Sequence, residues 1–242
     1  MVGGLLEPPR RATGRRAQRE REIRTIRPTA EPLQAVGTSN GDATARAQWR
    51  LLELGFWLQD PNGRYDQTTQ QAVMAFQKYH GLIADGSLGP ITAAALSEAS
   101  ELPQGASTAG TLVEVDKTKQ LVFIVEDGVT RWILNTSTGT EVPYDTINKN
   151  TGVRETGDSV TRPGLFEVNR QREEGWWAGD LGKIYRPKYF DGGIALHGSN
   201  YIPHYPASHG CVRLSTAAMD WIWENDLIPM RTTVWVHGDI PS

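Results

Sequence analysis

The sequence has a single cysteine, Cys211, among its 242 residues. One thiol excludes an internal disulfide and any zinc or iron–sulfur site built from several cysteines. No apolar run approaches the roughly 18 residues that a membrane-spanning helix needs. The opening residues, MVGGLLEPPR, lack the apolar core of a secretory signal peptide. An excess of basic residues is also missing, because the net charge is -3, and this argues against a dedicated nucleic-acid-binding protein.

Charge and periodicity divide the chain into four segments. Residues 1–43 begin with a stretch rich in arginine and almost without aromatic residues, and we expect a disordered basic tail or linker. Its arginines could attract an anionic surface, or they could serve only to solvate the linker. Residues 44–99 have helical periodicity, residues 100–110 have the composition of a linker, and residues 111–238 alternate with a period of two.

The second segment predicts a small three-helix domain. Its apolar residues recur at helical spacing around Trp49–Phe56, over 68–80 and over 91–99. Thr68 is the expected N-cap of the middle helix, and Gly81 is its expected C-cap. The turns before the last two helices share the order glycine, bulky residue, threonine, alanine-rich helix, which indicates a weak internal repeat.

The fourth segment predicts a mostly β domain. Short alternating stretches joined by turns favour strands over 112–116, 120–126 and 129–137. The exception is 215–225, which has helical character with Ser215 as a possible N-cap. The expected fold class is therefore α+β, with three N-terminal helices followed by a sandwich-like β domain.

Residues 194–215, IALHGSNYIPHYPASHGCVRLS, hold three of the five histidines and the only cysteine. A thiol is only partly ionised at neutral pH, and an imidazole that accepts its proton makes it an efficient nucleophile. Gly210 beside Cys211 would let a substrate carbonyl approach, so that the two backbone N–H groups could hold an oxyanion. This combination fits acyl transfer through a thioester, although a lone cysteine is more often a buried structural thiol.

A zinc site is the competing interpretation of the same stretch. His197, His204, His209 and Cys211 are residue types that bind zinc. Their spacing matches neither a helical H-E-x-x-H motif nor a C-x-x-C knuckle, and prolines between the histidines oppose a helical ligand face. We therefore expect no metal and no cofactor.

The segment S-H-G-C-V-R at 208–213, with a His-Gly pair upstream, resembles the L,D-transpeptidase family of bacterial cell-wall enzymes. Further segments resemble the family in order: TSTGT at 136–140, TRPGLFEV at 161–168, with Arg162 inserted between Thr and Pro, and YRPKYFDGGIALHG at 185–198. The resemblance covers roughly residues 111–238. It implies a β-rich catalytic domain, in agreement with the period-two pattern.

The helical segment has a resemblance of its own. QWRLLELGF, NGRYDQTTQQAVMAFQKYHGL and DGSLGPITAAAL are similar to the three-helix peptidoglycan-binding domain found in wall enzymes. Because both resemblances point to cell-wall proteins, each strengthens the other; this is an argument by analogy.

Carried over to this sequence, the resemblance implies catalytic roles for five residues. Cys211 would be the nucleophile and His197 the base that activates it. The backbone carbonyl of Gly198 would orient the His197 ring. His209 and Gly210 would shape the oxyanion site.

Substrate contacts are implied for four more residues. Ser208 precedes His209 as in the family, and Arg213, at the family's Asn-or-Arg position, could bind a substrate carboxylate. Tyr185 or Tyr189 would line the donor pocket. The charged segment 170–183, with its adjacent tryptophans, is either a mobile lid or sugar-stacking platform, or a surface loop anchored by one buried tryptophan.

The resemblance implies release of D-Ala from a tetrapeptide stem and a 3→3 cross-link to a second stem. If water resolves the thioester, the same scaffold is an L,D-carboxypeptidase; a lipoprotein lysine would make it an anchoring enzyme. A non-catalytic peptidoglycan-binding protein is the remaining alternative. The expected partners are peptidoglycan stem peptides and glycan, and the expected location is the extracytoplasmic cell envelope. The resemblance also implies a role in cell shape and acylation of the enzyme by carbapenems.

Overall fold

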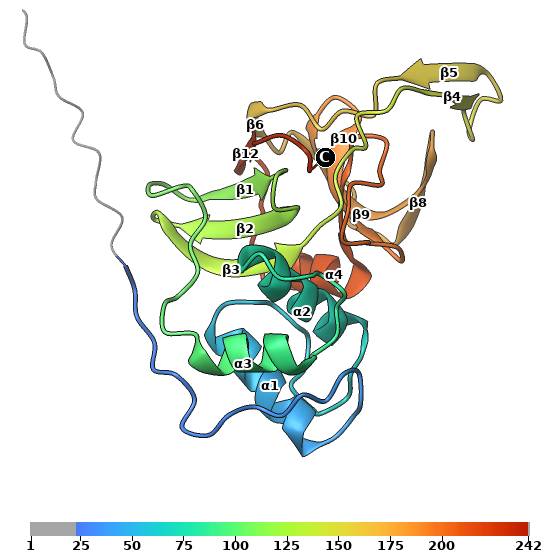
Figure 1. The fold of residues 1–242 in the computed structure, drawn as a ribbon. Coiled ribbons are helices and arrows are strands. Elements are labelled where there is room, and N and C mark those ends of the chain that lie inside the picture. Colours follow the sequence, from blue (N-terminus) through green and yellow to red (C-terminus); the bar gives the residue numbers. More distant parts are fainter. Residues whose placement is uncertain (1–22, 242) are drawn as a thin grey trace, which may run out of the picture.

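The computed structural model describes residues 23–241 (Figure 1). Three helices come first: α1 (Asp42–Glu53), α2 (Gln67–Tyr79) and α3 (Pro90–Glu98). A β-rich part follows, with α4 (Thr216–Glu224) packed against it. This is the expected α+β architecture. No helix among residues 23–241 has both the length and the apolar character to cross a membrane.

The first sheet has five strands in the order β3-β2-β1-β12-β6. β1 pairs with β2 in antiparallel fashion and with the late strand β12 in parallel, so the two ends of the β-rich part meet in this sheet. The bounds are β1 (Leu112–Asp116), β2 (Leu121–Glu126), β3 (Val129–Asn135), β6 (Gly164–Glu167) and β12 (Thr233–His237).

The second sheet has the order β11-β10-β9-β7, and β8 also pairs with β9. A separate hairpin, β4–β5, projects beyond the sheets (Figure 1). The bounds are β4 (Tyr144–Ile147), β5 (Arg154–Gly157), β7 (Arg170–Gln171), β8 (Trp176–Gly179), β9 (Gly182–Asp191), β10 (Ile194–Ser199) and β11 (Val212–Ser215).

Strand β2 contributes to two hydrophobic cores. Val122 and Ile124 face the core between the two sheets and α4. Leu121 and Phe123 face the opposite way, into a core shared with α1, α2 and α3. Both faces of the strand are therefore buried, which explains its nearly continuous apolar run where we expected alternation with a polar face.

The helical part is joined to the β part by more than this shared core. Phe56 forms a parallel bridge with Ile133, and Trp57 N–H donates to the Ile133 carbonyl at 3.1 Å. The Trp57 ring lies 5.0 Å from the Trp221 ring of α4. Figure 1 shows α2 directly below β3. The two parts thus pack as one body.

The prediction of a disordered segment over 1–43 is wrong for residues 24–37. Ile26 and Thr29 N–H donate to the carbonyls of Ser100 and Ser97, and Gly37 bridges to Leu88. The reason is long-range backbone pairing, which composition does not reveal. Residues 1–22, which hold most of the expected basic tail, lie outside the described residues.

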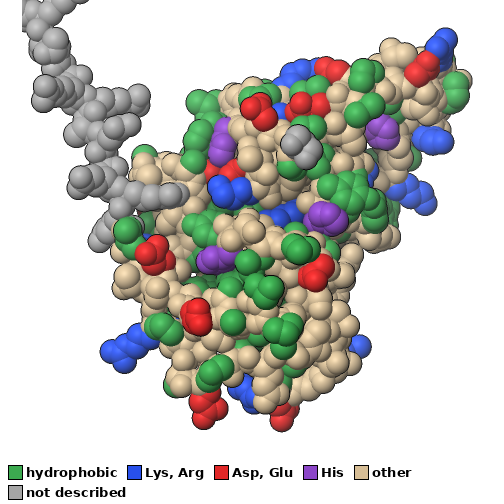
Figure 2. Space-filling model, in the orientation of Figure 1, with side chains coloured by type: hydrophobic (Ala, Val, Ile, Leu, Met, Phe, Trp, Pro, Cys, Tyr) green, Lys and Arg blue, Asp and Glu red, His purple; other side chains and the backbone are tan. Residues whose placement is uncertain are grey.

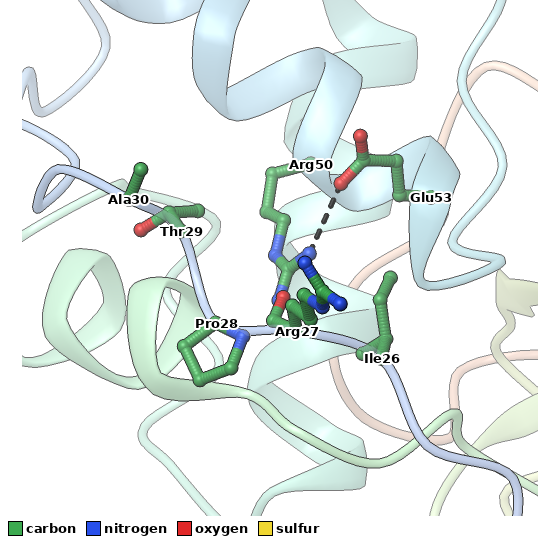
Figure 3. A pocket seen from close by; sticks show the side chains of 7 residues that line it. All are labelled: Ile26, Arg27, Pro28, Thr29, Ala30, Arg50 and Glu53. Carbon is green, nitrogen blue, oxygen red and sulfur yellow. Dashed lines mark hydrogen bonds and ion pairs between the residues drawn. The ribbon is translucent and has the colours of Figure 1, made fainter.

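Arg50 of α1 fixes this N-terminal segment (Figure 3). Its buried guanidinium donates to the carbonyls of Arg27, Leu96 and Ala99 at 2.6–3.3 Å and forms an ion pair with Glu53 at 3.0 Å. An open hollow beside it is lined by residues 26–30, Arg50 and Glu53. Neither a histidine nor Cys211 lines this hollow, and the contacts of Arg50 explain it as part of the packing of the N-terminal segment.

The predicted linker 100–110 is also held in place. Glu114 of β1 is fully buried, and its carboxylate accepts from the N–H groups of Ala106 and Ser107 and from His237 Nε2. The linker is thereby fixed to the sheet.

Helix capping was predicted correctly at one of two N-termini. Ser215 caps α4 by accepting from Ala218 N–H. For α2 the cap is Asp66, whose carboxylate accepts from Thr69 N–H, and the expected cap Thr68 hydrogen-bonds to Asp66 instead.

On the face shown in Figure 2, acidic and basic side chains are interspersed, without a large field of one sign.

Candidate active site

His197 and Cys211 come together because β10 and β11 are parallel neighbours. His197 pairs with Arg213 across the two strands. Cys211 lies two residues before Arg213, so their side chains point to the same face of the sheet. All three residues line one cavity of about 430 Å³. The fold therefore places the imidazole and the thiol on the lining of the same cavity.

The His197 ring is fixed by its own neighbour. Its Nδ1 lies 2.8 Å from the carbonyl oxygen of Gly198, as the resemblance implied. Since a carbonyl can only accept, Nδ1 carries the proton and Nε2 is left as the basic nitrogen. Burial lowers the pKa of His197 to about 4, and the nearby Arg213 cation lowers it further, while the Gly198 hydrogen bond opposes both effects. The ring is neutral at pH 7.

Cys211 is partly exposed, and its Sγ lies 3.8 Å from the carbonyl oxygen of Gly193. Burial raises the pKa of the thiol, whereas a backbone hydrogen bond from Ala195 and the charge of Arg213 lower it. The resting site thus holds a neutral thiol beside a neutral imidazole. Such a pair needs a general base to generate the nucleophile, and Nε2 of His197 is the group suited to that task.

The Ser208 hydroxyl organises the turn before Cys211. Ser208 Oγ donates to the Cys211 carbonyl at 2.6 Å and accepts from Gly210 N–H at 3.0 Å. The Gly210 N–H is therefore already engaged, contrary to its expected contact with an oxyanion. The Cys211 N–H has no hydrogen-bond partner among residues 23–241 and remains as the backbone donor.

Gly210 is required here for conformational reasons. Its φ is +122°, and a Cβ would lie 2.7 Å from the Ile194 side chain. Thr161 Oγ1 donates to the Gly210 carbonyl at 2.6 Å and accepts from Gly139 N–H at 2.9 Å. Thr161 was not among the predicted site residues, although it begins the TRPG segment that carried part of the resemblance.

The segment 136–140 holds the other side of this loop. The carbonyl of Thr138 accepts from the N–H groups of Ala207 and Ser208, both at 3.0 Å. Ser137 Oγ donates to the Tyr205 carbonyl at 2.8 Å. The TSTGT motif thus has a structural explanation, because it fixes the segment that leads to Cys211.

The remaining predicted residues divide between the cavity and its surroundings. Tyr189, Ser208, His209 and Arg213 line the cavity. His209 is exposed and packs edge-on against Tyr144 of the β4–β5 hairpin, with ring centroids 4.9 Å apart. Of the two tyrosines offered for the donor pocket, Tyr189 lines the cavity and Tyr185 does not, since the Tyr185 hydroxyl donates to Asp220 of α4 at 2.9 Å.

The segment 170–183 forms β7, β8 and the turn into β9. Trp177 lines the cavity, whereas Trp176 is 44% exposed and packs against Tyr185. The β4–β5 hairpin reaches this turn, since Lys149 N–H donates to the Asp180 carbonyl at 2.7 Å and Asn150 binds the Asp180 carboxylate. Two β-ribbons therefore border the cavity. Within the described part of the chain, no three His, Cys, Asp or Glu side chains gather as metal ligands would.

Comparison with known proteins identifies the family of this chain. A family model described as the L,D-transpeptidase catalytic domain matches residues 110–236, which is more than half of the chain. The chain belongs to this family. A family model described as a putative peptidoglycan binding domain matches residues 40–96, as expected for the helical part, and this match supports peptidoglycan as a partner.

Two solved structures are similar to this chain over most of its length. The crystal structure of an L,D-transpeptidase from Xylanimonas cellulosilytica is similar at 41% identity with a TM-score of 0.73, covering 87% of this chain and all of that one. An L,D-transpeptidase structure from Stackebrandtia nassauensis matches at 22% identity with a TM-score of 0.46, covering 89% of this chain and 99% of that one.

One curated relative shares a single region. The N-acetylmuramoyl-L-alanine amidase CwlM of Mycobacterium tuberculosis is 39% identical over 67 residues, 28% of this chain. The chain spans only 16% of the length of that relative.

Proposed function

We propose that this protein is a cysteine-dependent L,D-transpeptidase that cross-links peptidoglycan stems in the cell envelope. The supporting observation is that His197 and Cys211 face one cavity from adjacent strands, with the His197 ring fixed by the Gly198 carbonyl. The adjoining peptidoglycan-binding domain favours the same substrate.

The first half-reaction is acylation of the thiol. Nε2 of His197 accepts the thiol proton as Sγ of Cys211 attacks the carbonyl carbon before the terminal D-Ala of a tetrapeptide stem. The Cys211 N–H faces the developing oxyanion, and the Arg213 cation favours the negative charge. The C–N bond then breaks, the proton passes from His197 to the leaving amine, and D-Ala departs from the thioester.

In the second half-reaction an amine replaces the thiolate. The side-chain amine of the diamino acid on a second stem attacks the thioester carbonyl, and His197 accepts its proton. The C–S bond breaks, an amide forms, and the thiolate regains the proton. A carbapenem would acylate the same sulfur through its strained ring.

Mass spectrometry of products tests this proposal. The protein is incubated with a purified disaccharide-tetrapeptide beside a Cys211→Ala variant. Cross-linked dimers that have lost one D-Ala, absent with the variant, are expected. Tripeptide monomers alone would identify an L,D-carboxypeptidase in which water resolves the thioester. Unchanged substrate in both samples would contradict the proposal.

A further inference from the structure

The cavity that Cys211 lines also has positively charged side chains that form no ion pair with residues of the described chain. Four cations line it: Arg170, Arg172, Lys183 and Arg213. None of them forms an ion pair within residues 23–241. Unpaired guanidinium groups around a cleft indicate a site that receives its negative charge from a ligand.

The two acidic residues on the same wall do not offset this charge fully. Glu155 accepts hydrogen bonds from the Tyr144 hydroxyl and from Asn148 Nδ2 at 2.8–3.2 Å. Asp180 accepts from Asn150 Nδ2 at 2.9 Å. Both carboxylates are thus engaged with neutral groups of the β4–β5 hairpin. Four cations against two anions leave the cavity wall with a positive formal charge.

Arg170 and Arg172 are the cations whose orientation is best defined. They are two residues apart in or next to β7, so their side chains project to the same face. The Arg170 guanidinium lies 3.9 Å from the Tyr189 ring centroid, and that of Arg172 lies 4.2 Å from the centroid of Trp177. Stacking uses the flat face of a guanidinium and leaves its N–H edge available for a carboxylate.

Few of these edge donors are used within the protein. Arg170 Nη2 donates to the Gly192 carbonyl at 3.2 Å. The Arg172 side chain has no hydrogen-bond acceptor in the described part of the chain. The indole N–H of Trp177 is likewise buried without an acceptor among those residues. A ligand carboxylate beside Arg172 would supply acceptor oxygens to this corner of the cavity.

The distance from the thiol fits a peptide stem. The sheet order β11-β10-β9-β7 places Arg170 and Arg172 three strand spacings from the strand that follows Cys211. Three spacings are about 14 Å, and an extended chain advances about 3.3–3.6 Å per residue. Arginine side chains that extend over the sheet toward the cavity would therefore come within reach of the stem residues that precede the attacked bond.

We propose that Arg170 and Arg172 select donor stems with a free carboxylate on the acyl side of the bond that Cys211 attacks. The carboxylates available there belong to the second stem residue, a γ-linked glutamate, and to the third where the diamino acid is dicarboxylic. Amidation of either group removes the charge that the arginines bind. This inference rests on the proposed function and specifies its donor.

The test compares rates of thioester formation, followed by intact-protein mass spectrometry. The donors are tetrapeptides with free carboxylates, with an amidated second residue, and with an amidated third residue. A charge-assisted hydrogen bond contributes enough to change a rate by about 10- to 100-fold. The wild type should therefore form thioester at least about tenfold faster with the free donor than with one of the amidated donors.

Matched variants assign the preference to the two arginines. In the double variant Arg170→Gln/Arg172→Gln the ratio should fall to about one, and Arg172→Lys, which keeps the charge, should retain part of it. Arg131→Gln, which removes a surface arginine of β3 that forms an ion pair with Glu126 of β2, should keep the wild-type ratio. Equal iodoacetamide labelling of Cys211 in all variants shows that the thiol site is intact.

Two results would overturn the inference alone: equal acylation of the wild type by free and amidated donors, or an undiminished preference in the double variant. Absence of a thioester with every donor would instead overturn the proposed function, and the donor selection with it.

Discussion

Acid should destabilise this protein through His197. The ring is 4% exposed, and burial lowers its pKa from 6.5 to about 4. The unfolded chain binds a proton at this histidine as the pH falls through about 6.5, whereas the folded protein does not bind it until about pH 4. The stability associated with the neutral ring is therefore complete above pH 6.5 and is lost progressively between pH 6.5 and 4.

The size of the effect follows from the two pKa values. At pH 5 the difference in proton binding lowers the free energy of unfolding by about 2 kcal/mol, and at pH 4 by about 3 kcal/mol. His80 and His209 also have pKa values lowered by burial, so they add to the acid sensitivity. A His197→Gln variant isolates the contribution of His197, because the other two histidines remain.

Urea denaturation at pH 7 and at pH 5 measures both proteins. The loss of stability between the two pH values should be about 2 kcal/mol larger in the wild type than in His197→Gln. Equal losses in the two proteins would refute the reasoning, because they would show that the ring is as easily protonated in the folded state as in the unfolded chain.

Two further substitutions test the packing. Phe56→Ala removes a fully buried ring whose centroid lies 5.4 Å from that of Phe76 in α2. It should lower the free energy of unfolding by about 3–5 kcal/mol in a single urea transition. Trp49→Ala, at a side chain that is 58% exposed, should lower it by less than about 1 kcal/mol. Gly139→Ala would place a Cβ against the Ser159 carbonyl and the Gly210 backbone, so it should slow thioester formation, whereas Gly89→Ala, with no atom within 4 Å of the new Cβ, should leave that rate unchanged.

Local patterns predicted the four helices and the first three strands, and they singled out His197 and Cys211. The helical and alternating periodicities gave the three N-terminal helices and the first strands, because the buried faces of these elements follow the period. His197 and Cys211 could be recognised because both flank the same short loop between parallel neighbours. The Gly198 contact lies within one residue of His197, so it too is local.

The errors have a common physical origin in long-range pairing. The sequence could not decide between Tyr185 and Tyr189 at the cavity, because the Tyr185 hydroxyl binds Asp220, 35 residues away. The Gly210 N–H is a local exception, because the Ser208 hydroxyl two residues away accepts from it while donating to the Cys211 carbonyl. The charged neighbourhood of Arg172 could not be predicted, since it depends on how β7 and β8 align beside β9.

The same long-range contacts make the helical part a support for the active site. Gln71 of α2 accepts from Asn135 at the end of β3 at 2.7 Å, and its own amide donates to the Ile202 carbonyl at 3.3 Å. Gln67 reaches the carbonyl of Asn200 at 3.4 Å. These carbonyls belong to the loop between His197 and Cys211, which is held on its other side by the segment 136–140. The helical part therefore also holds one side of the loop that leads to Cys211, so the proposed wall-binding domain and the proposed active site are joined by direct hydrogen bonds.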